Sequence, residues 1–138
     1  MSIVVEAAES ERGERMPTVQ VSVQIFGLKS SQATRAAERF FKERRVAIQF
    51  VDLNLKPLAP GEIKRFIDRF GWDGLLDREG KAFIDAGMKY LRVSDAQLLE
   101  RIQREPKLLL LPLIRSGNQL SVGHDEASWK LMLAAPER

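Results

Sequence analysis

The chain contains no cysteine and only one histidine, His124, among its 138 residues. Without a thiol it cannot perform thiolate catalysis or disulfide exchange, and it cannot hold an iron–sulfur cluster or a cysteine-ligated zinc ion. A single histidine also excludes a metal site built from several histidines. The sequence therefore predicts no cysteine-based catalysis and no metal.

Long apolar segments and an apolar export signal near the start are also missing. No window of about 18 apolar residues occurs, so we expect no membrane-spanning segment and a cytoplasmic protein. Residues 1–17 mix charged and small residues without periodicity and are predicted to be a leader outside the folded region, with disorder as the expectation. Residues 18–135 are predicted to form one domain, followed by a frayed tail at 136–138.

Regular patterning begins at Val19, where apolar and polar residues alternate as far as Ile25. Alternation with period two is typical of a half-buried strand. Helical spacing of apolar residues follows over residues 31–44, and a second apolar run covers 46–53. A strand, a helix and a strand joined by short connections predict a parallel βαβ unit.

The middle of the chain has helical rather than strand patterning. Pro60 starts a helix with one apolar face that closes at Gly71, and the glycine-interrupted stretch 72–91 favours short helices. Ser94 and Gln97 form a capping box before another helix that ends ahead of Pro106. We therefore expect a helical block over about 60–106.

The last third of the chain predicts an antiparallel hairpin and a helix. An apolar run at 108–114 with Pro112 inside it is followed by turn residues 115–118 and by an alternating segment that ends at Gly123. Asp125 can cap a final helix with three residues on its buried face, namely Trp129, Met132 and Leu133.

This order resembles the thioredoxin fold, an α/β fold in which βαβ and ββα halves form a four-stranded mixed sheet flanked by helices, here with a helical insertion. Local sequences make the chain similar to the ArsC/Spx family of arsenate-reductase-like proteins. They are Ile25 to Lys29, Leu75-Leu76 with Gly80 to Phe83, Ser94 to Leu99, Leu110 to Ile114, and Val122 to Glu126. The resemblance implies a cis Leu111–Pro112 bond facing the active-site loop.

The sequence departs from the family's reductases at the positions that carry their chemistry. Where they have a cysteine at the start of the first helix, this chain has Ser31, and where an arginine precedes the proline it has Leu111. Asp77 and Glu79 stand at positions that are usually basic. Arsenate reduction by this chain is therefore not expected. Ser31 is interpreted as a helix cap because no general base is near it in sequence, and His124 as a packing or helix-entry residue.

The leading hypothesis is a redox-inactive member of the family that acts as a protein-interaction or regulatory module, with no catalytic residue and no cofactor. By analogy with the Spx branch, the partner is a protein, with the transcription machinery as one candidate. Lys64, Arg65 and Arg69 on the second helix are predicted to form an interaction surface. Glutamates interleave with the basic residues of both long helices, so direct nucleic-acid binding is not expected.

The alternative hypothesis is a divergent glutathione-dependent enzyme, similar to an arsenate reductase or a transferase, that uses bound glutathione as its only thiol. Lys29, Ser30, Ser31 and Pro112 would then hold the tripeptide or another anion at the former active-site loop. This hypothesis makes the loop a ligand site, whereas the leading one makes it inert.

Overall fold

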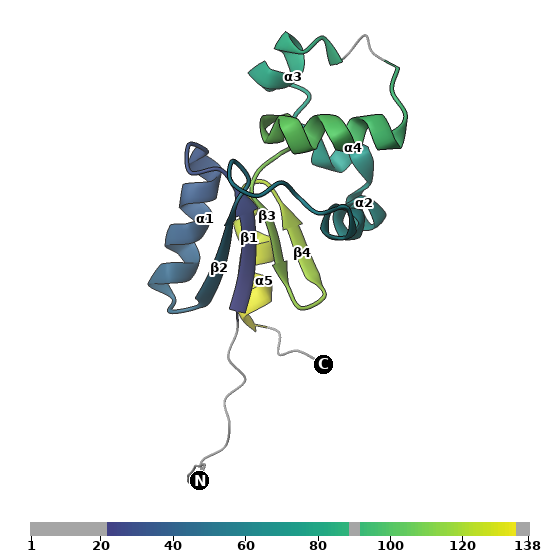
Figure 1. The fold of residues 1–138 in the computed structure, drawn as a ribbon. Helices are drawn as coiled ribbons and strands as arrows, with labels where there is room; N and C mark the ends of the chain where they lie inside the picture. Colours follow the sequence, from purple (N-terminus) through teal and green to yellow (C-terminus); the bar gives the residue numbers. More distant parts are fainter. Residues whose placement is uncertain (1–21, 89–91, 135–138) are drawn as a thin grey trace, which may run out of the picture.

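The computed structural model describes residues 22–88 and 92–134, which form an α/β fold in the predicted order (Figure 1). Val19, Val21, the predicted leader and the tail lie outside the described residues. The elements are β1 (Ser22–Gly27), α1 (Gln32–Glu43), β2 (Ala47–Asp52), α2 (Pro60–Leu75), α3 (Lys81–Asp85), α4 (Asp95–Arg104), the 3₁₀ helix η2 (Pro106–Leu108), β3 (Leu113–Ser116), β4 (Gln119–Val122) and α5 (Glu126–Ala134).

The four strands form one mixed sheet, as predicted, and the structure gives their order as β2-β1-β3-β4. β1 pairs in parallel with β2 and antiparallel with β3, and β3 pairs antiparallel with β4. The central position of β1 corrects one expectation. Ile25 is buried on one face and Phe26 on the other, because helices cover both faces at this end of the strand, so β1 is more than half-buried.

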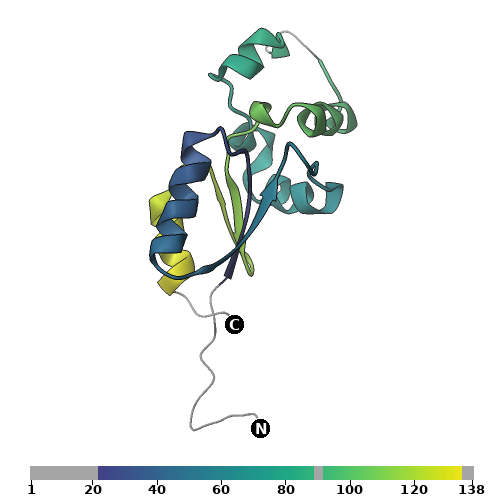
Figure 2. The same cartoon turned by 60° about the vertical axis from the view of Figure 1, so that its left-hand side comes forward.

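Helices α1 and α5 lie together on one face of the sheet, as the turned view shows (Figure 2). Phe40 and Phe41 of α1 lie against the fully buried Trp129 of α5, with ring centroids 5.3 and 6.0 Å from it. Ile25 and Ile114 of the two central strands complete this core. The predicted buried face of the last helix is confirmed for Trp129 and Met132, and Leu133 is partly buried.

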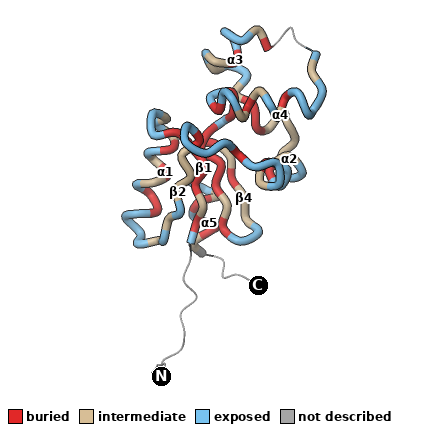
Figure 3. Tube along the Cα trace, in the orientation of Figure 1, coloured by how far each residue is buried: buried red, intermediate tan, exposed pale blue. Residues whose placement is uncertain are grey.

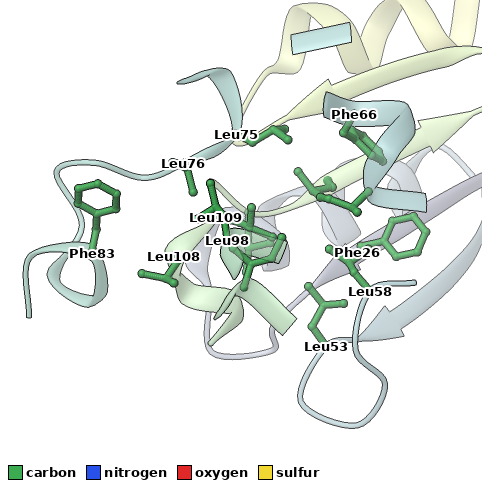
Figure 4. Packing of buried hydrophobic residues seen from close by; sticks show 14 of the residues in the cluster. Phe26, Leu53, Leu58, Phe66, Leu75, Leu76, Phe83, Leu98, Leu108 and Leu109 are labelled. Atoms are coloured by element: carbon green, nitrogen blue, oxygen red, sulfur yellow. The ribbon is translucent and has the colours of Figure 1, made fainter. Parts of the chain in front are cut away.

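The other face of the sheet carries α2, while α3 and α4 lie beyond the ends of the strands (Figures 1 and 2). A mainly aliphatic core joins this helical block to the sheet (Figure 4). Phe26 of β1 meets Phe66 of α2 edge to face, with centroids 6.4 Å apart. Leu76 and Leu109 form an isolated antiparallel bridge between the end of α2 and the segment after η2. Buried residues thus continue from the sheet into the helical block (Figure 3).

The predicted end of the second helix at Gly71 is confirmed as a break, since its φ of 71° and ψ of 166° interrupt the helical backbone inside α2. The predicted strand over 108–114 is wrong in its first half. Leu108 ends η2, and β3 begins only at Leu113. The Leu110 N–H donates to the Leu75 carbonyl at 2.7 Å, so the backbone of this segment pairs with the helical block and not with the hairpin, while the Leu110 side chain is exposed.

Pro112 consequently precedes β3 instead of lying within it, and the Leu111–Pro112 peptide bond is cis, as predicted. The turn of the hairpin is also shorter than expected. Arg115 and Ser116 belong to β3, and only Gly117 and Asn118 connect the strands.

Candidate functional site

Ser31 lies where β1 passes into α1 and caps that helix. Its Oγ accepts a hydrogen bond from the Thr34 N–H at 3.2 Å, and its own N–H donates to the Leu28 carbonyl at 2.9 Å. Thr34 packs directly against Gly27, where an added Cβ would collide with the Thr34 side chain. The helix-cap interpretation of Ser31 is therefore confirmed, and glycine at the end of β1 allows this tight start of the helix.

Beside this turn lies a cleft of about 560 Å³, which is the candidate site. Ser30 and Ser31 line it, as do Leu111, Gly123 and His124; the other lining residues are Leu28, Ala33, Asp77, Gly80, Lys81, Ala82, Lys107, Leu109 and Leu110. The start of α1, the helical block, the segment before β3 and the turn before α5 therefore meet here.

The other two residues predicted for this site do not line the cleft. Pro112 is buried, and its carbonyl accepts a hydrogen bond from the Gly123 N–H at 2.9 Å, so it supports two lining residues, Leu111 and Gly123. Lys29 is exposed, with its Nζ 5.7 Å from the centroid of the Phe50 ring. The predicted set therefore comes together only in part.

Two lysines of the cleft, Lys81 and Lys107, were missed by the sequence reasoning. Lys81 donates a hydrogen bond to the Asp85 carboxylate at 2.6 Å, and this carboxylate raises the pKa of Lys81 above its ordinary value of 10.5. Lys107 is exposed on η2. The cleft therefore has cations, although not in the family's usual places. A signal for Lys81 existed, since it lies in one of the stretches that resemble the family.

Asp77 and Glu79 stand at positions that are usually basic in the family, but only one of these two acidic residues lies at the cleft. Asp77 lines it, next to Gly80, whereas Glu79 does not. Leu111, which stands where the reductases carry arginine, also lines it. The lining residues thus include two serines, two lysines and one aspartate, and Lys81 is also paired with Asp85.

His124 packs on Trp129, with ring centroids 5.0 Å apart, which confirms its interpretation as a packing residue. Its Nε2 lies 3.4 Å from Glu126 Oε2. Within residues 22–88 and 92–134, no three histidine, aspartate or glutamate side chains are arranged to hold a metal ion. No helix of the described part is long and apolar enough to cross a membrane.

The predicted interaction residues Lys64, Arg65 and Arg69 are exposed on α2, and none of them lines the cleft. Lys64 is paired with Asp68 at 2.9 Å, and Arg65 lies 4.0 Å from Glu62. The Arg69 guanidinium lies 5.7 Å from the Phe70 ring centroid. This surface is basic, but part of its charge is balanced within the helix.

Residues 26–132 match the family model described as the ArsC family. The chain belongs to the ArsC family. It is 26% identical over 108 residues to the global transcriptional regulator Spx 2 of Oceanobacillus iheyensis, an alignment that covers 77% of this chain and 79% of that protein.

Solved structures agree on the thioredoxin-like fold. A YFFB protein matches with a TM-score of 0.72 at 20% identity, covering 81% of this chain and 99% of its own. An arsenate reductase from Vibrio cholerae matches with a TM-score of 0.66 at 16% identity, covering 83% and 98%. The chain is thus an ArsC family member that lacks cysteine altogether.

Proposed function

We propose that this protein is a redox-inactive ArsC family member that acts as a protein-interaction or regulatory module. The observation that carries the proposal is the state of Ser31, which stands where the family's reductases carry their thiol. Its Oγ caps α1, and the chain has no cysteine elsewhere that could supply the missing thiol. A hydroxyl near its ordinary pKa needs an adjacent general base to act as a nucleophile. The one histidine directs its Nε2 toward Glu126.

The partner we propose is a subunit of the transcription machinery. Support comes from the relative in Oceanobacillus iheyensis, which is itself a transcriptional regulator. On this chain the exposed Lys64, Arg65 and Arg69 would contribute rim charges to the interface. Rim charges act mainly on the association rate and its salt dependence.

Affinity capture from cytoplasmic extract, with the full chain as bait, tests this proposal. We expect RNA polymerase subunits to be recovered, and we expect the triple variant Lys64→Glu, Arg65→Glu, Arg69→Glu to recover less at the same melting temperature. The matched control is Ser30→Ala with Ser31→Ala, which alters the cleft and leaves α2 intact. Recovery of no polymerase subunit by the wild-type chain would exclude the proposed partner.

The redox-inactive part of the proposal has a separate test in Ser31→Cys. Leu111 and Asp77 line the cleft, so a restored thiol would still lack the arginine that usually precedes the proline. Preorganised charge around a developing oxyanion commonly contributes several kcal/mol to such a reaction. We therefore expect no arsenate turnover by Ser31→Cys with glutathione and glutaredoxin, and measurable turnover would contradict this account.

A second candidate function, glutathione binding, is favoured by one observation: Lys81 and Lys107 line the same cleft as Ser30 and Ser31. Lys107, which has no carboxylate partner among the described residues, would bind a carboxylate of the tripeptide, whereas Lys81 is already paired with Asp85. A thermal-shift titration with glutathione decides it, because a ligand at 100 times its Kd stabilises the folded state by about 2.7 kcal/mol. An unchanged melting temperature at millimolar glutathione would exclude useful affinity, and a shift lost in Lys107→Ala would favour this second function.

A further inference from the structure

A second hollow of about 500 Å³ adjoins the cleft, between the first half of α1 and His124. Its lining residues are Gln32, Ala33, Arg35, Ala36, Arg39 and His124, and we call it the α1 groove. Ala33 and His124 line both hollows, so the α1 groove continues the cleft around the start of α1.

Two arginines supply the charge of the α1 groove. Arg35 and Arg39 are one helical turn apart and exposed, and among the described residues neither has a carboxylate within 4.0 Å. Arg35 Nη1 donates to the Lys29 carbonyl at 2.8 Å, which holds this guanidinium beside the turn before α1. Within the described residues, the charge of the α1 groove is therefore not balanced by a carboxylate, in contrast to the paired Lys64 and Arg65 on α2.

The other groups of the groove decide between two kinds of anionic ligand. Glu126 lies beside His124, and Glu38 stands between the two arginines in the sequence of α1, so this surface offers two cations and not the continuous row of cations that tracks a nucleic-acid backbone. Nucleic-acid sites also present phenylalanine, tyrosine or tryptophan rings for base stacking, and no residue of these three types lines the α1 groove. The small side chains of Ala33 and Ala36 leave room for a side chain of a peptide.

We propose that the α1 groove binds an acidic segment of a partner protein, with Arg35 and Arg39 binding its carboxylates. Guanidinium groups bind carboxylates through two parallel hydrogen bonds, and two of them spaced by one helical turn select for at least two acidic residues. This inference deepens the proposed interaction function and rests on it, because it assigns the partner's chemistry and a surface separate from α2.

Fluorescence anisotropy of a fluorescein-labelled peptide of alternating glutamate and alanine, titrated with the full chain at about 50 mM salt, tests the inference. We expect binding that the double variant Arg35→Glu, Arg39→Glu weakens by about tenfold or more. The control is Lys56→Glu with Arg104→Glu, two exposed residues outside α2, the cleft and the α1 groove, which makes the same change in net charge elsewhere and should retain wild-type affinity. Arg35 also donates a hydrogen bond to the Lys29 carbonyl, so its replacement removes a contact within the fold as well as a charge. The single variant Arg39→Glu therefore tests the charge without disturbing that contact.

Three outcomes would overturn the inference: no binding by the wild-type chain, equal weakening by the two double variants, or tighter binding of a single-stranded oligonucleotide through the same arginines. Capture of polymerase by the same variants shows whether the groove hypothesis fails alone or the proposed interaction function fails as well. If Arg35→Glu, Arg39→Glu fails to bind the peptide but still captures polymerase, the groove is not the partner site while the interaction function stands. If the peptide binds through the groove but no polymerase is captured, the groove stands and the proposed partner falls.

Discussion

Helices α1 and α2 have the same sequence pattern, an apolar face opposite a basic one, yet they present different surfaces. Both contain a cation followed four residues later by an acid, Arg39 with Glu43 and Lys64 with Asp68. Only the second pair forms an ion pair, at 2.9 Å. The spacing therefore permits a pair, and the conformations of the side chains decide whether it forms. As a result, among the described residues the α1 arginines have no carboxylate partner, whereas α2 neutralises part of its charge.

The two helices also begin differently. The Ser31 side chain caps α1, whereas α2 follows Ala59, which offers no side-chain cap, and starts with Pro60 at its first position. α1 is continuous, but α2 is broken at Gly71. The local sequence thus fixes α1 more firmly, and α2 depends more on its packing against the sheet.

The largest expected effect is on the buried faces, where the two helices should be equivalent. Phe41 of α1 and Phe66 of α2 are both fully buried. Replacing either by alanine should lower the free energy of unfolding by about 3–5 kcal/mol, measured by urea denaturation. If Phe66→Ala costs far less than Phe41→Ala and broadens the transition, the helical block unfolds separately from the α1 side of the sheet.

A smaller effect is expected at the break in α2. Gly71 has a φ of 71° and a ψ of 166°, a region that residues with a Cβ rarely occupy, so Gly71→Ala should destabilise the protein by about 1–3 kcal/mol. Gly61 is the matched control, because it lies in the same helix with no atom near its missing Cβ. Gly61→Ala should be neutral or slightly stabilising in the same denaturation assay. Equal effects of the two substitutions would show that the break at Gly71 is not required.

Substitutions at the two helix starts should change the free energy of unfolding in opposite directions. Ser31→Ala removes the hydrogen bond to the Thr34 N–H and should cost about 1 kcal/mol. Ala59→Ser adds a capping hydroxyl to α2, where the backbone is already extended, and should stabilise by about 0.5–1 kcal/mol. The stability changes of both variants can be measured by calorimetric melting. A loss of stability in Ala59→Ser would mean that the start of α2 is held by packing alone.

The smallest expected effect concerns the surface ion pair. Lys64→Ala should cost about 0.3–0.5 kcal/mol at low salt through loss of the pair with Asp68, and the difference should fade at about 1 M salt. Arg39→Ala, without such a partner among the described residues, should show no salt-dependent loss. A salt-dependent loss of similar size in Arg39→Ala would show that Arg39 and Glu43 do pair in solution.

Much of the fold could be predicted because its signals are local. The apolar spacing of 60–70, the Ser94–Gln97 capping box and the Asp125 cap each depend on residues within about one turn, and each is present in the structure. The stretch 108–112 was misinterpreted because a continuous apolar run is compatible with any buried conformation. Its actual form depends on Leu75 to Asp77, more than thirty residues earlier in the chain.

The sequence by itself determined the order of the elements, the family resemblance and the absence of any thiol, since each depends on residue identity or short-range spacing. Only the tertiary structure decided which charges meet. It brought Lys81, Lys107 and His124 to the cleft beside Ser31, and it left Arg35 and Arg39 without carboxylate partners in the described region. The physical reason is that contacts between distant segments follow from how helices pack on the sheet and from side-chain conformation, and local periodicity does not specify either.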